Sequence, residues 1–115
     1  MNRYRFHSGI DLPSWHGAPI YATASGTVKK TGWLADYGYH VEIDHGYGFT
    51  TLYGHNSANL VEPGQQVQKG QIIGRVGSTG LSEGNHCHYE VRYYDRPVDP
   101  NRFLNLNIFT ASTGF

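Results

Sequence analysis

Two histidines stand two positions apart in the segment "NHCHYEVR", which otherwise has the composition of a β-strand. Successive side chains of a strand point to opposite faces, so His86, His88 and Glu90 would share one face. Cys87 would then point the other way, into the core. The histidines would then form a polar face that looks into a cleft. An imidazole in such a place can bind a metal ion or transfer protons near neutral pH. Two histidines on a solvated strand are an equally good interpretation of this motif taken alone.

A second motif, "FHSGID", separates His7 from Asp11 by four positions. Imidazole nitrogens and carboxylate oxygens both bind zinc, and a catalytic zinc usually combines three protein ligands with one position open for water. His7, Asp11 and one of the two later histidines would meet this requirement. A His-X3-Asp pair is a weak signal by itself and gains weight only in this combination.

A third motif, "TTLYGHNS", ends an alternating segment in which Thr51, Tyr53 and His55 are expected to face one way. Taken alone, His55 is best interpreted as capping a turn. Three histidine-bearing segments and an aspartate together meet the needs of metal-assisted hydrolysis, which are metal ligands, an open position and imidazoles for proton transfer. The chain contains neither His-Glu-X-X-His nor Gly-X-Ser-X-Gly, which excludes a helix-borne glutamate base and an α/β-hydrolase nucleophile.

The elements that must position these residues are short segments of alternating apolar and polar residues, separated by Gly, Pro, Asn and Asp. Helical periodicity is nowhere sustained. The pattern predicts an all-β domain of antiparallel strands in two layers, with little or no helix. We expect strands on both sides of Ser25-Gly26 within 18–33, a hairpin over 39–55 turning at 45–48, a second hairpin over 65–80 turning at Lys69-Gly70, a loop over 56–64 and a last strand over 86–94.

Composition limits the function classes. A chain of 115 residues has room for one domain with a single core. Nine basic side chains balance nine acidic ones, so no electrostatic surface for nucleic acid or an anionic membrane is expected. Cys87 is the only cysteine, which excludes an internal disulfide and a cysteine-based zinc knot. No apolar run has membrane-spanning length, and the first residues lack the apolar core of a signal peptide.

The motifs "FHSGIDL", "PIYATASGTV", "VEIDHGYGFTTLYGHNS", "VEPGQQVQKGQIIGRVGSTG" and "NHCHYEVR" resemble, in order and spacing, the lysostaphin-like or LytM-type zinc endopeptidases that cut peptidoglycan. The resemblance covers His7 to Leu104 and implies one peptidase domain over 1–115, with a core at 7–104 and a tail at 105–115. It implies a β-fold of the barrel-sandwich-hybrid type, in which antiparallel strands form a groove with zinc at its floor. The family usually has a strand before His-X3-Asp; only six residues precede His7, so we expect that strand to be missing or truncated.

Carried over position by position, the resemblance implies that His7, Asp11 and His88 bind one Zn²⁺, and that His55 and His86 are metal-free catalytic histidines. It implies hydrolysis of peptide bonds in peptidoglycan, either stem-peptide cross-links or glycine-containing bridges, by a metal-activated water. Peptidoglycan peptides would then be the partners, and the bacterial envelope, periplasmic or extracellular, the location. We expect a monomer that binds no nucleic acid and makes no membrane contact through this domain.

Several other residues carry smaller expectations. Glu90 is predicted to accept a hydrogen bond from a metal-bound imidazole, since such rings usually donate their other N–H to a carboxylate or carbonyl. Tyr37 and Tyr39 are predicted to line the groove, because aromatic faces suit an extended peptide. His45 is expected to hydrogen-bond within its turn, and Asn56, where the family often has leucine, to touch no ligand.

Two other functions fit parts of the sequence. The first is a LytM-type domain that no longer cuts and instead binds or activates another wall enzyme; such domains typically lose ligands or catalytic histidines, and all five positions are filled here. The second is a biotinyl or lipoyl carrier, which shares the glycine-turned pattern of "VEPGQQVQKGQIIGRVG" and would place Lys69 at a hairpin tip. A carrier gives no reason for the histidines.

Overall fold

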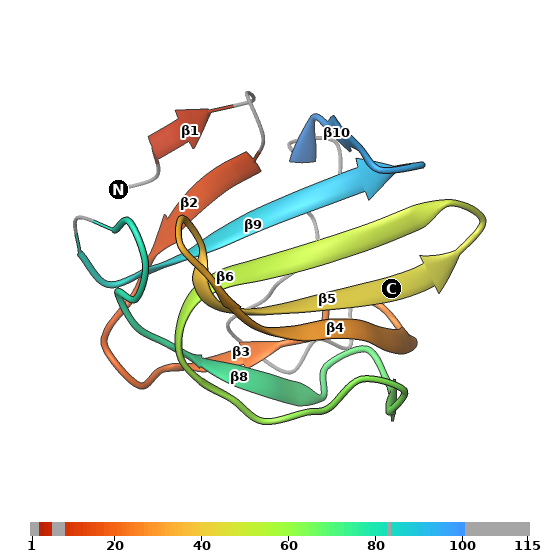
Figure 1. The fold of residues 1–115 in the computed structure, drawn as a ribbon, viewed down its shortest axis with the longest axis horizontal. Helices are drawn as coiled ribbons and strands as arrows, with labels where there is room; N and C mark the ends of the chain where they lie inside the picture. The colour runs from red at the N-terminus through yellow and green to blue at the C-terminus, as the bar shows by residue number, and fades with distance from the viewer. Residues whose placement is uncertain (1–2, 6–8, 83, 101–115) are drawn as a thin grey trace.

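The computed structural model describes residues 3–5, 9–82 and 84–100, and this part of the chain is built from β-strands without an α-helix. The prediction of an all-β fold is confirmed. Within the described residues there is accordingly no apolar helix of membrane-crossing length. The strands are β1 (Arg3–Arg5), β2 (Gly9–Pro13), β3 (Pro19–Tyr21), β4 (Gly26–Leu34), β5 (Gly38–Gly46), β6 (Phe49–Asn59), β7 (Gln66–Val67), β8 (Ile72–Val76), β9 (His86–Tyr93) and β10 (Arg96–Val98) (Figure 1).

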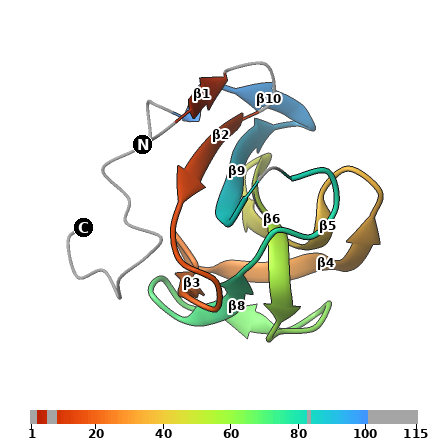
Figure 2. The ribbon, with the colours of Figure 1, turned by 90° about the vertical axis from the view of Figure 1, so that its left-hand side faces the viewer.

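The strands pair antiparallel in the order β1-β2-β9-β6-β5-β4-β7, with β10 against β9. A second layer is formed by β3 and β8, and Figure 2 shows these two strands lying below β2 and β9. The long strand β6 joins the layers, because its first part pairs with β5 and β9 while its last residues pair with β8. The four central strands β2, β9, β6 and β5 carry most of the residues predicted to do chemistry.

The hydrophobic core lies between the two layers. Alternate residues of the central strands face it, among them Val41 and Ile43 of β5 and Tyr89 of β9, and they meet Ile20 and Ile73 from β3 and β8. Each fully buried aliphatic side chain contributes about 1.5–3 kcal/mol to the free energy of unfolding. Cys87 is also fully buried in this cluster, which confirms the predicted alternation of β9.

The second predicted hairpin is wrong. A turn does occur at Lys69-Gly70, but β7 pairs with β4 and β8 pairs with β3 and β6, so the strands that flank the turn are not hydrogen-bonded to each other. The local pattern identifies the turn without identifying the partner strands. Residues 56–59, predicted as part of a loop, continue β6.

Strand β10 was not predicted, because the strand over 86–94 was expected to be the last; β10 contains Pro97. Its position explains how the proline is tolerated: within the described residues β10 pairs only with β9, and an edge strand has backbone N–H groups that need no partner strand. At the other end, β1 pairs with β2 in the register Arg3↔Asp11, so a three-residue strand precedes His-X3-Asp. Its truncation relative to the family stays a prediction, and the tail at 105–115 lies outside the described residues.

His45 lies at the end of the β5–β6 hairpin, and the expectation that it bonds within its own turn is wrong. Its Nδ1 donates to the carbonyl of Ser25 on the neighbouring chain segment (2.8 Å), and its Nε2 is 2.7 Å from Oγ1 of Thr51. Strand pairing brings these groups beside the ring, which sequence distance alone does not indicate. His45 therefore has a structural role that links β6 to the residues before β4.

Candidate functional site

The pairing of β2 with β9 places Asp11 directly opposite His88 on the face turned away from the core. Nδ1 of His88 lies 2.9 Å from Oδ1 of Asp11, and its Nε2 lies 2.8 Å from Oε2 of Glu90. The imidazole thus spans two carboxylates. Burial alone lowers the pKa of His88, but the hydrogen bonds to Glu90 and Asp11 outweigh burial and raise the pKa above its ordinary value.

Glu90 is fully buried beneath this imidazole and is held from both sides. Arg92 donates from Nε (2.9 Å) and Nη2 (2.8 Å) to Oε1, while the hydroxyl of Tyr37 donates to Oε2. Burial raises the pKa of Glu90, but the hydrogen bonds from His88 and Tyr37 and the charge of Arg92 lower it overall, so the carboxylate stays ionised. The predicted contact between Glu90 and His88 is present; its part in metal binding stays a prediction.

A second buried carboxylate, Glu42 of β5, extends the charged row. Nη1 of Arg92 lies 3.8 Å from Oε1 of Glu42, and Nε2 of His40 lies 3.5 Å from Oε2. The proximity of His40 is the largest cause that lowers the pKa of Glu42. Sequence reasoning missed Glu42 and Arg92 as parts of this network, although Arg92 continues the alternation of His88 and Glu90 along β9.

His55 and His86 lie beside His88. The His55 ring contacts His86 edge-on, with centroids 4.7 Å apart, and its centroid is 6.0 Å from that of His88. Nδ1 of His55 donates to the carbonyl of Thr79 (2.6 Å), so Nε2 carries the lone pair in the neutral ring. Burial lowers the pKa of His55 despite this hydrogen bond, and the neighbouring imidazoles lower it further. His55 is therefore neutral at neutral pH and able to accept a proton.

His86 is oriented in a similar way. Its Nδ1 donates to the carbonyl of Gly84 (2.9 Å), and its Nε2 lies 3.4 Å from Oδ1 of Asp11. The structure thus brings Asp11, His55, His86 and His88 together at one place. The fifth predicted residue, His7, lies outside the described residues.

His55 reaches this place by breaking the alternation of β6. Thr51 and Tyr53 share a face, as predicted, but it is the core face; His55 contacts His86, which lies on the other side of the sheet. The prediction that all three share one face is therefore wrong at His55. The reason is its left-handed backbone (φ 64°), which turns the side chain over. A non-glycine residue there costs of order 1–3 kcal/mol and is typical of functional sites.

Two loops hold His55 in this conformation. Its N–H donates to the carbonyl of Tyr37 (2.6 Å), and its ring is held by Thr79 from the loop after β8. The loops also bind each other, since the N–H of Leu81 donates to the carbonyl of Asp36 (3.0 Å). Their backbones approach so closely that a Cβ on Gly38 would clash with the Thr79 loop. Neither Thr79 nor this role of Tyr37 was predicted from the sequence.

Comparison with known proteins places this arrangement in a family, because Peptidase family M23 matches residues 5–100. The chain belongs to peptidase family M23. The M23 domain is 43% identical over 100 residues to the DD-carboxypeptidase/endopeptidase Mpg of Neisseria meningitidis serogroup B, covering 87% of this chain and 23% of the relative. It is 41% identical over 107 residues to the peptidoglycan DD-endopeptidase ShyA of Vibrio cholerae, covering 93% and 24%.

A third relative is named for a different role. The murein hydrolase activator NlpD of Salmonella dublin is 39% identical over 99 residues, covering 85% of this chain and 26% of the relative. The M23 domain therefore spans about a quarter of the length of these curated relatives.

Solved structures confirm the lysostaphin-like fold. The catalytic domain of the antimicrobial peptidase lysostaphin from Staphylococcus simulans superposes with a TM-score of 0.86 at 29% identity, covering 91% of this chain and 92% of that one. A zinc-containing peptidase from Vibrio cholerae gives a TM-score of 0.77 at 38% identity, covering 80% and 28%.

The donor set of the M23 domain suits zinc in its chemistry. Asp11 and His88 offer a carboxylate oxygen and an imidazole nitrogen to one point, and Glu90 holds the far nitrogen of His88, as carboxylates commonly do for ligand histidines. Within residues 9–82 and 84–100, together with 3–5, no three His, Cys, Asp or Glu side chains form a complete metal site. The predicted ligand set requires His7 as well.

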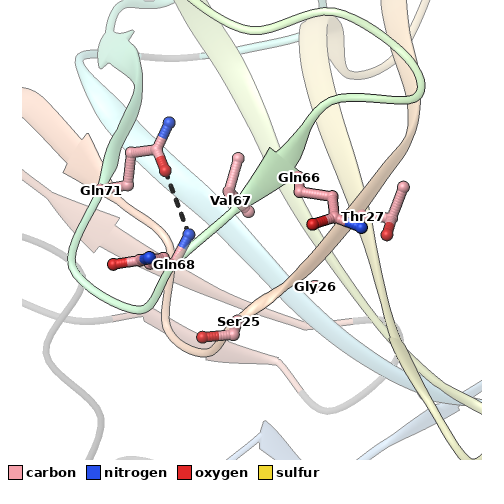
Figure 3. A pocket seen from close by; sticks show the side chains of 7 residues that line it. All are labelled: Ser25, Gly26, Thr27, Gln66, Val67, Gln68 and Gln71. Carbon is pink, nitrogen blue, oxygen red and sulfur yellow. Dashed lines mark hydrogen bonds between the residues drawn. The ribbon is translucent and has the colours of Figure 1, made fainter.

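A pocket of about 460 Å³ lies elsewhere, between the start of β4 and the β7–β8 connection. Figure 3 shows its uncharged lining, in which the N–H of Gln68 donates to the side chain of Gln71 (3.1 Å). It contains no titratable side chain among its lining residues and none of the predicted site residues. The pocket is therefore separate from the cluster of Asp11, His55, His86 and His88.

Proposed function

We propose that the chain is a zinc-dependent endopeptidase domain that hydrolyses peptide bonds in peptidoglycan. The observation that carries this proposal is the convergence of Asp11, His88, His55 and His86 on one face of an M23 fold. The endopeptidase relatives and the zinc-containing structural neighbour support it. His7, Asp11 and His88 would hold one Zn²⁺, and the bacterial envelope, where peptidoglycan lies, would be the place of action.

A zinc ion at such a site supplies a water nucleophile at neutral pH and polarises the scissile carbonyl. His55 and His86 would move the protons. Each donates Nδ1–H to a backbone carbonyl, which leaves Nε2 to exchange a proton with water or the leaving amine. One of the two would act as acid and base while the other stabilises the developing negative charge. Each role is worth roughly two to four powers of ten in rate.

The test combines metal content with activity. We expect about one zinc per chain and release of peptides from purified peptidoglycan that stops when a chelator is added. His55→Ala and His86→Ala should keep zinc and lose roughly 100-fold or more in turnover. His16→Ala, at an exposed position, is the matched control and should keep both. Undiminished turnover in both single variants would sink the assignment of the catalytic pair, and absence of zinc from the wild-type chain would sink the zinc enzyme.

A second function is supported by the similarity to a murein hydrolase activator. In that case the domain would bind another wall enzyme and increase its activity without cutting. The same experiment distinguishes the two, since zinc without peptide release, together with stimulation of an added wall amidase or peptidase, would favour activation. The presence of both described catalytic histidines in contact supports the cutting enzyme.

The strand pairing around Lys69 argues against the biotinyl or lipoyl carrier. A carrier requires its lysine at the tip of a hairpin, whereas the strands on either side of Lys69 pair with other strands. Mass spectrometry of the purified chain should accordingly find Lys69 unmodified.

A further inference from the structure

Tyr37 contacts the site in three different ways. Its ring stacks on the imidazole of His88, with centroids 5.3 Å apart and planes inclined by 25°. Its hydroxyl donates to Oε2 of Glu90, the same oxygen that lies 2.8 Å from Nε2 of His88. Its main-chain carbonyl accepts the N–H of His55 at 2.6 Å. One residue thus touches a predicted metal ligand, the carboxylate behind that ligand, and the backbone of a predicted catalytic histidine.

Tyr37 and Tyr39 were predicted together as residues that line the groove, but their contacts differ. Tyr37 is partly buried against the site, and burial together with Glu90 raises the pKa of its hydroxyl to about 12, so it stays a hydrogen-bond donor. Tyr39 is 43% exposed and stacks edge-on against Trp33 with centroids 5.1 Å apart. Tyr37 lies over Gly54 of β6, where a Cβ would be in ordinary van der Waals contact with the Cβ of Tyr37 (3.4 Å). Tyr39 therefore offers a nearby comparison that lacks the inward contacts.

We propose that Tyr37 is a positioning residue that fixes the ring of His88 relative to the main chain of His55. This inference rests on the proposed function and names a residue that the metal and proton-transfer roles leave out. The imidazole of His88 can turn about its side-chain bonds, and the stacked ring of Tyr37 limits that rotation while its hydroxyl holds the Glu90 oxygen in place. The carbonyl contact ties the same loop to the left-handed backbone at His55.

Zinc affinity gives a test that does not depend on turnover. Tyr37→Phe keeps the stack and the carbonyl contact and removes only the hydroxyl, so zinc affinity, measured by competition against a chelator, should fall about tenfold, as for other partners of ligand side chains. Tyr37→Leu loses the stack as well and should bind zinc more weakly still. In peptidoglycan cleavage, kcat should fall while KM stays within about twofold, because the interaction lost is made to the site and not to the substrate. Tyr39→Phe should leave zinc affinity unchanged.

The outcomes separate the two proposals. If Tyr37→Phe binds zinc with wild-type affinity, the positioning role is overturned. If its KM is also raised, Tyr37 is a substrate contact instead. A wild-type chain that binds no zinc overturns the proposed function and this inference with it. Tyr37→Phe changes no shape, so it decides the matter even if Tyr37→Leu fails to fold, and thermal unfolding of each zinc-free variant checks that the fold is intact.

Discussion

The central sheet carries a polar network on each of its faces, and the two differ in charge. On the outer face, His88, Glu90, Arg92 and Glu42 form a charged row that includes two buried carboxylates. On the core face the network is built from hydroxyl groups and one imidazole whose pKa burial lowers. Its members are His45, Thr51, Tyr53, Thr23 and Tyr89.

The difference in charge indicates which network stabilises the fold. Hydroxyl groups that are fully hydrogen-bonded can be buried at little net cost. In the core, the Tyr53 hydroxyl accepts a hydrogen bond from Oγ1 of Thr51 (2.9 Å) and shares another with Oγ1 of Thr23 (2.9 Å). Buried ion pairs contribute little net stability, because desolvation offsets their attraction. We therefore expect the intact core-face network to add net stability without affecting metal binding, and the intact outer-face network to serve metal binding, although breaking one of its ion pairs also costs stability. Substitutions on each face test this separation.

The largest effect is expected from the predicted ligands themselves. His88→Ala removes a donor from a three-ligand site, and Asp11→Asn replaces a charged carboxylate oxygen by a weaker neutral amide oxygen, so zinc affinity should fall by more than roughly 100-fold, measured by chelator competition. Asp95→Asn, at an exposed aspartate whose left-handed backbone suits asparagine, is the control. Zinc retained by Asp11→Asn would remove this residue from the ligand set.

Glu90→Gln should affect both properties, because the half-buried guanidinium of Arg92 loses its charge partner. We expect the free energy of unfolding to fall by about 2 kcal/mol, since Arg92 keeps partial solvent contact, and zinc affinity to fall about tenfold. Urea unfolding and chelator competition measure the two effects. Adding Arg92→Met should recover part of the stability without recovering zinc affinity; recovery of both together would contradict the separation.

Tyr53→Phe probes the opposite face. It removes the hydroxyl that accepts the N–H of Thr23 (3.1 Å) and bonds Thr51, and unsatisfied buried groups cost about 1–2 kcal/mol. Urea unfolding should show this loss, while zinc affinity should match the wild type. A tenfold loss of zinc affinity in this variant would show that the two faces are not separate.

The smallest effect concerns pH and His45. Burial lowers the pKa of His45 below its ordinary value of 6.5, so the unfolded state binds this proton more readily than the folded state. The contribution of His45 to stability should be full above about pH 6.5 and decline as the pH falls towards the folded-state pKa. Unfolding free energies of wild type and His45→Gln between pH 8 and pH 5.5 measure it by difference. Parallel curves would show that His45 does not titrate with folding.

The sequence predicted those parts of the site that follow from regular strand geometry. Alternation along β9 placed Cys87 in the core and Glu90 beside His88, as found. It failed at His55, because the left-handed backbone there depends on the carbonyl of Tyr37, a partner distant in sequence. The pairing of β7 with β4 was missed for the same reason: local patterns identify turns, while strand partners are chosen by the whole sheet.

The thiol of Cys87 can report when strand β9 separates from its neighbouring strands. The thiol is the only one in the sequence, and it is fully buried in the strand that carries both later histidines. Burial also raises its pKa, so the thiol reacts poorly until water reaches it. The rate at which a thiol reagent modifies the native protein should therefore measure how often β9 separates from its neighbours. If added zinc slows this rate, the slowing would report zinc binding without any substrate.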